Sequence, residues 1–478
     1  MNEMVRSWKK KSWDRRDWSR ETGQLISMTW PVILELLLTG VINTGSQYYL
    51  NAYSSDAVAV QGSLSQVVSF AGNLYTLISV GGSILLAPMI GAVKARESGV
   101  LIRTMLLCNL ILAGVVSACT LALSGTFMHM MGIEPALRDL GQQYLTVNFG
   151  LSFVQAMMVT YSAVFRSIGR MKDMLVANFT VYMVCFLLNA AVYYGMPLGE
   201  QKLLYYALNG IIGQMLGVCF LAVKLHIYMK KRGMIIKIID SGRTILRYLK
   251  RILQFGIPGG MEGILFQVTQ LVIVSMMGTL GTESLLVKSY VGIFGGYMVI
   301  CTVGIQTAVF VLIGQKLGEK NSPAIRSIFR IGLIMGFALT LLVGLGMILF
   351  SRPILHLFTD TESVIHQVQA LLWLQLAMEL ARVLAALSIS GLKAIGETGF
   401  PLLMVIPGSF CSILIAYLLG IRLGLGLPGI WLGYIADLLL RGLAETAVFY
   451  RRTTDDAIRR ERVMGEGDII ETNKINVK

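Results

Sequence analysis

Long apolar runs separated by short polar stretches dominate the sequence. Each run is long enough to cross a hydrocarbon core of about 30 Å at about 1.5 Å per helical residue. The pattern therefore predicts an all-α polytopic membrane protein with twelve transmembrane helices. The second run of each half is overlong and is expected to include an interfacial piece. The predicted spans are 25–49, 58–90, 104–126, 145–165, 173–196, 204–226, 256–278, 286–312, 331–351, 367–391, 400–420 and 428–449.

The second half of the chain repeats the first at a numbering shift of 227. This shift places Pro31 on Pro258 and Glu35 on Glu262, and further coincidences occur without any gap. Because six helices per half is an even number, the halves are expected to be parallel repeats, two six-helix lobes related by an axis along the membrane normal. The further matched pairs are Asn43 with Gln270, Gly91 with Gly318, Arg103 with Arg330, His129 with His356 and Gly169 with Gly396.

Composition and charge agree with a membrane protein. Of the 478 residues, 55% are hydrophobic and 14% charged, which is too apolar for an ordinary soluble protein. The net charge of +14 does not indicate nucleic-acid binding, because the basic residues lie between hydrophobic runs. With the N-terminus in the cytoplasm, most of the 41 lysine and arginine residues fall on that side, as the positive-inside rule requires. We therefore predict a multi-pass plasma membrane protein with both termini cytoplasmic.

Five segments follow from this topology. The first apolar run lacks a convincing cleavage site, so it is expected to remain as a helix and not to be removed as a signal peptide. A short amphipathic helix is expected around 235–253, in the linker between the lobes. The predicted segments are a basic cytoplasmic leader (1–23), an N-lobe (24–227), a cytoplasmic linker (228–252), a C-lobe (253–450) and a cytoplasmic tail (451–478).

Motifs for nucleotide hydrolysis, metal binding and redox chemistry are not found. The sequence contains no phosphate-binding G-x-x-x-x-G-K-[ST] motif, and its four histidines are dispersed. The six cysteines lie within apolar segments without metal-like or redox-like spacing. We therefore expect no enzymatic activity and no cofactor or metal.

Acidic residues inside the apolar runs are the strongest functional candidates. A charge near the bilayer centre costs at least ~2.5–3.5 kcal/mol, so it should face protein or a water-filled cavity. Glu35 and Glu262 are duplicated, and amide or hydroxyl groups such as Asn43, Ser46 and Gln270 follow on the same helices. Burial disfavours the charged carboxylate, so such acids can bind and release a proton or exchange it for a cation. The alternative is that both glutamates lie near a membrane face and only orient their helices.

Further polar candidates lie in the fifth, tenth and twelfth spans. Glu379 and Arg382 are three residues apart, and Asp437 and Arg441 are four apart, which are spacings that allow ion pairs within a helix. Both a structural and a coupling role are open for these pairs. Asn189 adds a buried amide, for which interhelical hydrogen bonding is the alternative role.

Several motifs together resemble the multidrug and toxic compound extrusion (MATE) family over nearly the whole chain. They are the proline-led first and seventh helices, IGQKLGEKN (313–321), FRSIGRMKD (165–173), LKAIGETGFP (392–401) and GLPGIWLGYIADLLLRG (426–442). The resemblance implies two six-helix lobes in a V, alternating access, and export of amphipathic, often cationic compounds in exchange for protons or sodium.

The sequence departs from the family pattern at the expected ion site. Many members carry an aspartate three residues after the first-helix asparagine, whereas here Ser46 follows Asn43. Members with a second acid four residues after Asn189 would have it at Tyr193. The acid that another branch of the family carries in the seventh helix would fall near Phe266. We therefore hypothesise that Glu35 substitutes for the missing aspartate.

The sequence thus predicts a secondary active exporter of small organic solutes that works in the lipid bilayer as a monomer. The coupling ion is expected to be H+ or Na+, with Glu35 and Glu262 as the coupling residues. A flippase for a lipid-linked saccharide is the nearest alternative, but it is expected to have a strongly basic cavity. A channel or a non-transporting membrane sensor is a more distant alternative.

Overall fold

The computed structural model describes residues 15–51, 55–131, 133–195, 202–234, 242–356 and 358–454, and in these ranges the chain forms helices joined by short turns. Residues 1–14 of the predicted leader and residues 455–478 of the predicted tail lie outside the described residues. The transmembrane-length helices and their companions are α2 (Arg15–Asn51), α3 (Ser55–Gly91), α4 (Ala95–Ala122), α5 (Ser124–Met130), η1 (Pro135–Leu137), α6 (Arg138–Gly150), α7 (Ser152–Ser167), α8 (Met171–Gly195), α9 (Lys202–Lys231), α10 (Gly242–Gly278), α11 (Thr282–Gly318), α12 (Ser322–Leu349), α13 (Ser351–Leu355), α14 (Glu362–Ala394), α15 (Gly399–Ile415), η2 (Ala416–Arg422) and α16 (Leu427–Arg452).

The described helices confirm the predicted twelve spans, with one change of shape. Eleven helices are long and apolar enough to cross a membrane, and the bent pair α6 and α7 supplies the twelfth span. The fourth span, predicted at 145–165, is present but is not one straight helix, because the axis turns by 47° between α6 and α7. The hydroxyl of Ser117 in α4 donates to the carbonyl of Phe149, and that of Ser152 donates to the carbonyl of Ala113. These bonds to a neighbouring helix accompany the break in the helical ladder.

Three other predicted boundaries change. Helices α3 (predicted at 58–90) and α11 (predicted at 286–312) are each continuous over 37 residues, so any interfacial piece in these runs belongs to the same helix as the span. Helix α2 already begins at Arg15, inside the segment predicted as a leader. Helix α10 begins at Gly242, so residues 242–252 are the first turns of a transmembrane helix and not a separate linker helix. Residues 235–241 of the predicted amphipathic helix lie outside the described residues.

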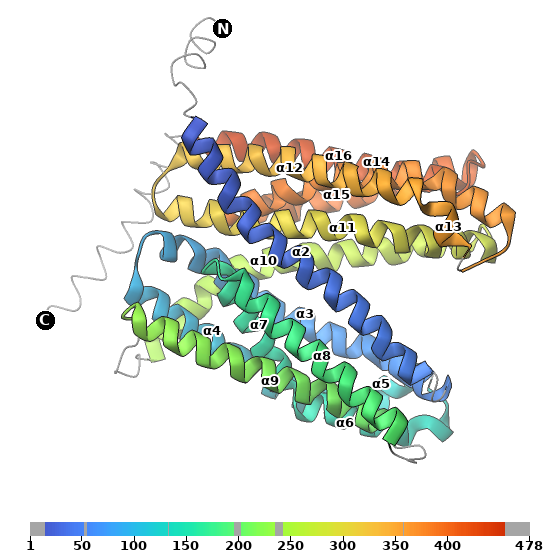
Figure 1. The fold of residues 1–478 in the computed structure, drawn as a ribbon, viewed down its shortest axis with the longest axis horizontal. Coiled ribbons are helices and arrows are strands. Elements are labelled where there is room, and N and C mark those ends of the chain that lie inside the picture. Colours follow the sequence, from blue (N-terminus) through green and yellow to red (C-terminus); the bar gives the residue numbers. More distant parts are fainter. Residues whose placement is uncertain are drawn as a thin grey trace, which may run out of the picture.

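The two halves of the chain form two helix bundles, and the first helix of each half connects them (Figure 1). Leu25, near the start of α2, is buried in a core built by α11, α12, α14 and α16 of the C-lobe. Ile252, near the start of α10, is buried in a core of the N-lobe built by α3, α4 and α7 to α9. The repeat shift places Leu25 on Ile252, so the residue that anchors the first helix in the other lobe occupies the equivalent position in each half.

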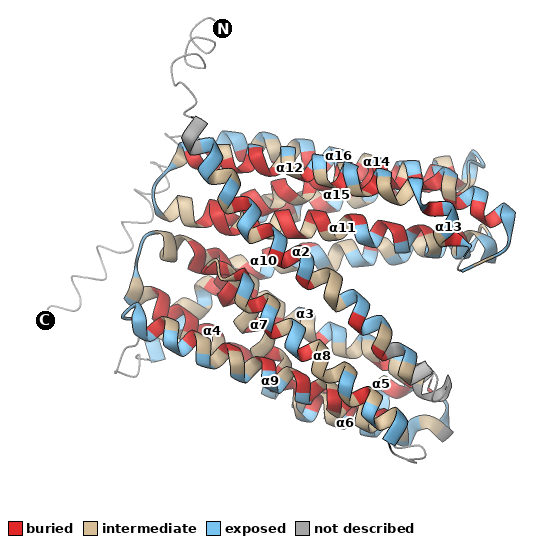
Figure 2. Cartoon of the chain, viewed as in Figure 1, coloured by how far each residue is buried: buried red, intermediate tan, exposed pale blue. Residues whose placement is uncertain are grey.

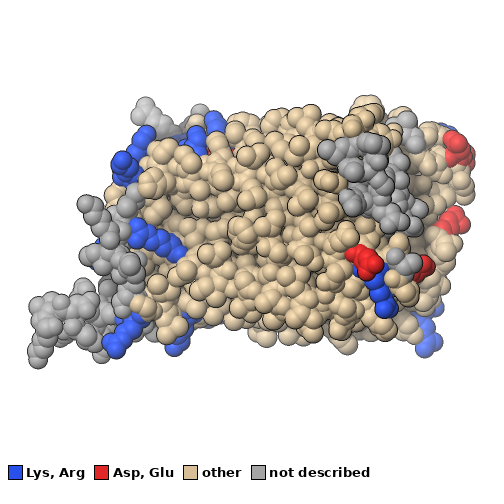
Figure 3. Space-filling view, turned by 90° about the horizontal axis from the view of Figure 1, so that it is seen from below, with Lys and Arg blue, Asp and Glu red and all other residues tan. Residues whose placement is uncertain are grey.

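The two ends of the molecule differ in charge. We call the end at which α2 begins and α16 ends the basic end, and the opposite one the far end. Lys230 and Lys231 lie in the last turn of α9 at the basic end, and Arg451 and Arg452 lie in the last turn of α16 there. In the face shown in Figure 3, lysines and arginines gather toward one end, acids lie toward the other together with a few basic side chains, and a broad uncharged band separates the two ends. This band fits the hydrocarbon core of a bilayer.

Apolar side chains cover the outer faces of both lobes. Leu271, Leu342 and Phe410 are among the large hydrophobic residues that are about 70% exposed, at 71%, 70% and 69%. Figure 2 shows buried residues along the helix faces that turn toward one another within each lobe. Apolar surface of this extent on transmembrane-length helices is a surface for lipid.

The lobes meet most closely at the basic end, where glycines of α3 and α11 lie against backbone. A Cβ atom on Gly91 would lie 1.9 Å from the carbonyl oxygen of Gln315, and one on Gly318 would lie 1.9 Å from that of Pro88. The amide of Gln315 also donates a hydrogen bond of 3.0 Å to the carbonyl of Ser167 in α7. From this contact the two bundles diverge toward the far end (Figure 1). The fold is therefore a V that is closed at the basic end.

Candidate functional site

A buried glutamate of the N-lobe pairs with a base from a neighbouring helix. Glu35 in α2 is 4% exposed, and its Oε1 lies 3.0 Å from Nη2 of Arg166 in α7. The amide nitrogen of Asn178 in α8 donates to the same oxygen at 2.6 Å. Oε2 has no hydrogen-bond partner among the described residues. Arg166 thus balances the charge of the carboxylate through one of its oxygens, and the other oxygen is left without a described partner.

The C-lobe repeats this arrangement. Oε2 of Glu262 in α10 lies 2.7 Å from Nζ of Lys393 in α14. The same ammonium group donates a hydrogen bond of 2.9 Å to the carbonyl of Gly259. Its contact with Glu262 is an ion pair without good hydrogen-bond alignment, since Oε2 has no hydrogen-bond partner among the described residues. The shift of 227 places Arg166 on Lys393 as well as Glu35 on Glu262. The duplicated feature is therefore a whole ion pair that ties the first helix of each lobe to the fourth.

These pairs correct one assignment made from the sequence. The predicted fourth and tenth spans end at 165 and 391, which leaves Arg166 and Lys393 outside them. In the structure α7 extends to Ser167 and α14 to Ala394, so both bases belong to helices and are partly buried. The repeat shift itself was the signal that could have identified them as partners of the two glutamates.

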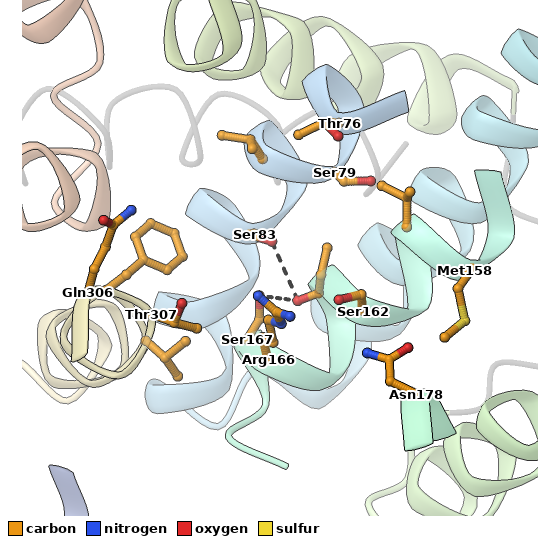
Figure 4. A pocket seen from close by; sticks show the side chains of 15 residues that line it. Thr76, Ser79, Ser83, Met158, Ser162, Arg166, Ser167, Asn178, Gln306 and Thr307 are labelled. Carbon is orange, nitrogen blue, oxygen red and sulfur yellow. Dashed lines mark hydrogen bonds between the residues drawn. The ribbon is translucent and has the colours of Figure 1, made fainter. Parts of the chain in front are cut away.

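A cavity of about 460 Å³ lies between the lobes beside Arg166 (Figure 4). Its walls come from α3, α7 and α8 of the N-lobe and from α11 of the C-lobe. Hydroxyl and amide groups of Ser79, Ser162 and Gln306 share these walls with the apolar side chains of Met158 and Phe310. The lining is therefore amphipathic, with Arg166 as its charged residue among those described.

A second cavity, of about 290 Å³, lies inside the N-lobe. It collects three of the predicted residues, Asn43 and Ser46 of α2 and Asn189 of α8. The carbonyl oxygen of the Asn189 side chain accepts a hydrogen bond of 2.9 Å from Asn209 of α9. None of the residues that form the described lining is acidic or basic. Asn178 lines both cavities, so this neutral cavity adjoins the Glu35 ion pair.

The two ion pairs predicted within C-lobe helices are confirmed. Oε2 of Glu379 lies 2.8 Å from Nε of Arg382, and Gln375 donates to its other oxygen at 2.8 Å. Arg441 binds both carboxylate oxygens of Asp437 at 2.7 Å. The two acids, Glu379 and Asp437, are 1% and 2% exposed. Their charges are balanced within their own helices, and the roles of the pairs in coupling stay predictions.

Sequence reasoning missed one buried acid in the last helix. Glu445 of α16 is 0% exposed, and neither of its carboxylate oxygens has a hydrogen-bond partner among the described residues. It lies within electrostatic range of Glu262, Lys393, Asp437 and Arg441. Its position inside an apolar run, four residues after Arg441, was the signal available in the sequence.

The nine predicted site residues do not converge on one point. Asn43, Ser46 and Asn189 line the N-lobe cavity, and Glu35 adjoins it through Asn178. Glu262, Glu379, Arg382 and Asp437 belong to the charged interior of the C-lobe, and the side-chain carbonyl of Gln270 accepts a hydrogen bond of 2.6 Å from the hydroxyl of Tyr434. In the described part of the chain, no group of histidine, cysteine and acidic residues could hold a metal ion.

Comparison with known proteins gives the family. The model of the family described as MatE matches residues 31–194 and 258–418, and its two matches begin 227 residues apart, as the repeat requires. An uncharacterized transporter of Bacillus subtilis, YisQ, is 25% identical over 447 residues, which cover 92% of this chain and 96% of YisQ. A probable multidrug resistance protein NorM of Thermotoga maritima is 22% identical, with 89% of this chain and 91% of that protein covered.

Solved structures share the fold at low sequence identity. One is described as the outward-facing conformation of a multidrug resistance MATE family transporter of the MOP superfamily. It superposes with a TM-score of 0.81 at 18% identity and covers 92% of this chain and 97% of its own. A MATE crystal structure in a bent conformation gives a TM-score of 0.82 at 17% identity, with the same coverage. The two-lobed arrangement of twelve spans is therefore the fold of these proteins.

Proposed function

Because the chain belongs to the MatE family of transporters, we propose that it is a secondary active exporter. It carries amphipathic, predominantly cationic organic compounds out of the cell in exchange for H+ or Na+. Its lobes alternate between the V described here and a form that opens at the basic end. The basic end faces the cytoplasm, in accord with the excess of lysine and arginine there. The names of the NorM relatives, which are multidrug resistance proteins, agree with this substrate class.

The observation that carries the proposal is the amphipathic cavity between the lobes. It lies where the two halves converge, with walls from α3 and α7 on one side and α11 on the other. A site between two lobes gains or loses contacts when the lobes move, so a bound solute can differ in affinity between the two states. Its volume of about 460 Å³ falls within the range of small-molecule sites.

The Glu35 ion pair provides a mechanism for exchange. Arg166 lines the cavity and is neutralised by Glu35. When a proton forms an O–H bond on the Glu35 carboxylate, the guanidinium loses its counter-charge and repels a cationic solute from the cavity. Proton binding and solute binding then oppose each other, which is the thermodynamic requirement for antiport. Na+ bound at the free Oε2 would act in the same sense.

The structure gives less support to the lipid-linked saccharide alternative. That function was expected to require a strongly basic central cavity. Here four bases within the described helices have an acidic partner: Arg166 with Glu35, Lys393 with Glu262, Arg382 with Glu379 and Arg441 with Asp437. Paired bases leave little net positive charge to attract a phosphate.

Efflux from proteoliposomes tests the proposal. We expect purified protein to move a fluorescent organic cation when a pH gradient is imposed, or when a sodium gradient is imposed instead. The gradient that drives efflux identifies the coupling ion. Protein-free vesicles and vesicles without a gradient are the controls. Absence of efflux under both gradients, with protein in the required orientation, would contradict the assignment and lead to a lipid-flipping assay.

A further inference from the structure

The last helix carries an alternating stripe of acids and a base along one face. Asp437, Arg441 and Glu445 follow one another at intervals of four residues in α16. Arg441 forms a bidentate pair with Asp437, since its Nε and Nη2 atoms each lie 2.7 Å from a carboxylate oxygen of that residue. Glu445 has no bond to Arg441, although it is 0% exposed. Neither of its oxygens has a hydrogen-bond partner among the described residues.

The helices packed around α16 do not supply a free base for Glu445. From α10 the charged group that faces it is Glu262, and from α14 it is Lys393. Lys393 is already shared between Glu262 and the carbonyl of Gly259. Helix α15 contains no acidic or basic residue, and Arg422 of η2, which also packs against α16, is exposed. Arg326 of α12 donates to the hydroxyl of Thr453 and to the carbonyl of Tyr450 at the end of α16. Glu262, Asp437 and Glu445 therefore face Lys393 and Arg441, and Arg382, which is paired with Glu379, also lies within electrostatic range of Asp437. These four acids and three bases have one negative charge in excess if all the groups are ionised.

A proton resolves this imbalance at the lowest energetic cost. An unpaired carboxylate in a protein interior costs several kcal/mol even after relaxation, whereas a neutral carboxylic acid costs far less. The protein interior here offers Glu445 no hydrogen-bond donor that would stabilise the ionised form. We propose that Glu445 is a proton-binding site of the C-lobe, occupied when the lobes are closed at the basic end and emptied when they open there.

Release of this proton would act on α10. When the O–H bond of Glu445 breaks and the proton passes to water, the carboxylate left behind attracts the nearest shareable base, Lys393. Lys393 then weakens its contacts with Glu262 and with the carbonyl of Gly259, which directly follows Pro258 in α10. Proton release is thereby linked to the packing of α10 against α14 and α16. The role in coupling rests on the proposed function, whereas the protonation of Glu445 does not.

Infrared spectroscopy of the full chain in a detergent without ester groups tests the protonation directly, because phospholipid esters absorb in the same region as a carboxylic acid. A buried carboxylic acid gives a carbonyl stretching band that an ionised carboxylate does not give. We expect this band at neutral pH in the wild type and its loss in Glu445→Gln, which keeps the side-chain volume. The control Glu134→Gln changes an exposed glutamate and should leave the band unchanged. A wild-type spectrum without the band, or full intensity in Glu445→Gln, would overturn the proposal.

A transport measurement separates this inference from the proposed function. The number of protons exchanged per fluorescent organic cation should fall in Glu445→Gln, while passive solute exchange without a gradient persists. If Glu445→Gln keeps the wild-type proton count, the coupling role is refuted and the antiporter assignment stands. If the wild type shows no gradient-driven efflux, the proposed function fails, and the infrared band still decides whether Glu445 holds a proton.

Discussion

At the residue scale, the two matched ion pairs are the feature that most constrains the mechanism. Glu35 is almost fully buried, and Arg166 and Asn178 supply the groups that stabilise its charge. A buried pair of this kind adds little net stability, but loss of one partner leaves an uncompensated charge inside the protein. Replacement of one partner should therefore lower the stability of the protein, whereas replacement of both partners by neutral residues should change the stability little.

Substitution of Arg166 tests this reading of the pair. We expect Arg166→Gln to lower the free energy of unfolding by about 3 kcal/mol or more, since Glu35 keeps only Asn178 as a partner. The double variant Glu35→Gln with Arg166→Gln should recover most of this loss, because no unpaired charge remains. Thermal unfolding of the single and double variants measures the coupling between the two sites. A double variant as unstable as Arg166→Gln would show that the pair is not energetically coupled.

The sequence identified the acids of the site but not their partners. Glu35 and Glu262 stand out because they are charged, lie in apolar runs and occur at equivalent positions. Their bases were missed because lysines and arginines at helix ends look like topology signals, and hydropathy alone ended the spans too early. Glu445 has an apolar residue, Val218, at its repeat position, so the duplication gave no indication of it.

At the scale of elements, glycines determine how closely the lobes can approach. Gly91 and Gly318 are equivalent residues of α3 and α11, and each lies directly against the backbone of the other helix. Any side chain there would collide with a carbonyl group, which cannot move aside as a flexible side chain can. Closure at the basic end therefore depends on these two positions.

We predict that Gly91→Ala or Gly318→Ala opens the contact at the basic end. Spin labels at the basic ends of α4 and α12 should report a longer distance between the lobes in these variants than in the wild type. Gly114→Ala is the matched control, because a Cβ there meets nothing within 4 Å. This control should keep the wild-type distance and gain roughly 0.5–1 kcal/mol of helix stability. Unchanged distances in Gly91→Ala would contradict the role assigned to the glycine contact.

The helices themselves were predictable, whereas their bends and crossings were not. Apolar runs and the charge bias located all twelve spans, since both report directly on the bilayer. The 47° bend between α6 and α7 accompanies hydrogen bonds from Ser117 and Ser152 to other helices, which local sequence does not reveal. The burial of Leu25 in the opposite lobe is likewise a result of packing between halves.

For the whole molecule, the duplicated sequence becomes two lobes with equivalent anchors and unequal interiors. Each lobe has an anchoring residue in the other and a glutamate paired with a base of its fourth span. The N-lobe holds a neutral polar cavity, and the C-lobe holds a set of buried charges. The symmetry is consistent with a rocking motion of the lobes between two states. The difference between their interiors is consistent with different contributions of the two lobes to solute binding and to ion binding.

The most direct measurement is coupled efflux in the double variant Glu35→Gln with Glu262→Gln, because both ion pairs then lose their acid. We predict that the folded variant no longer exports a fluorescent organic cation in response to the coupling gradient, since neither lobe can exchange a proton for an ion pair. The control Glu134→Gln with Glu283→Gln changes two exposed glutamates at the far end and should keep wild-type efflux. Gradient-driven efflux at the wild-type rate in Glu35→Gln with Glu262→Gln would contradict the account.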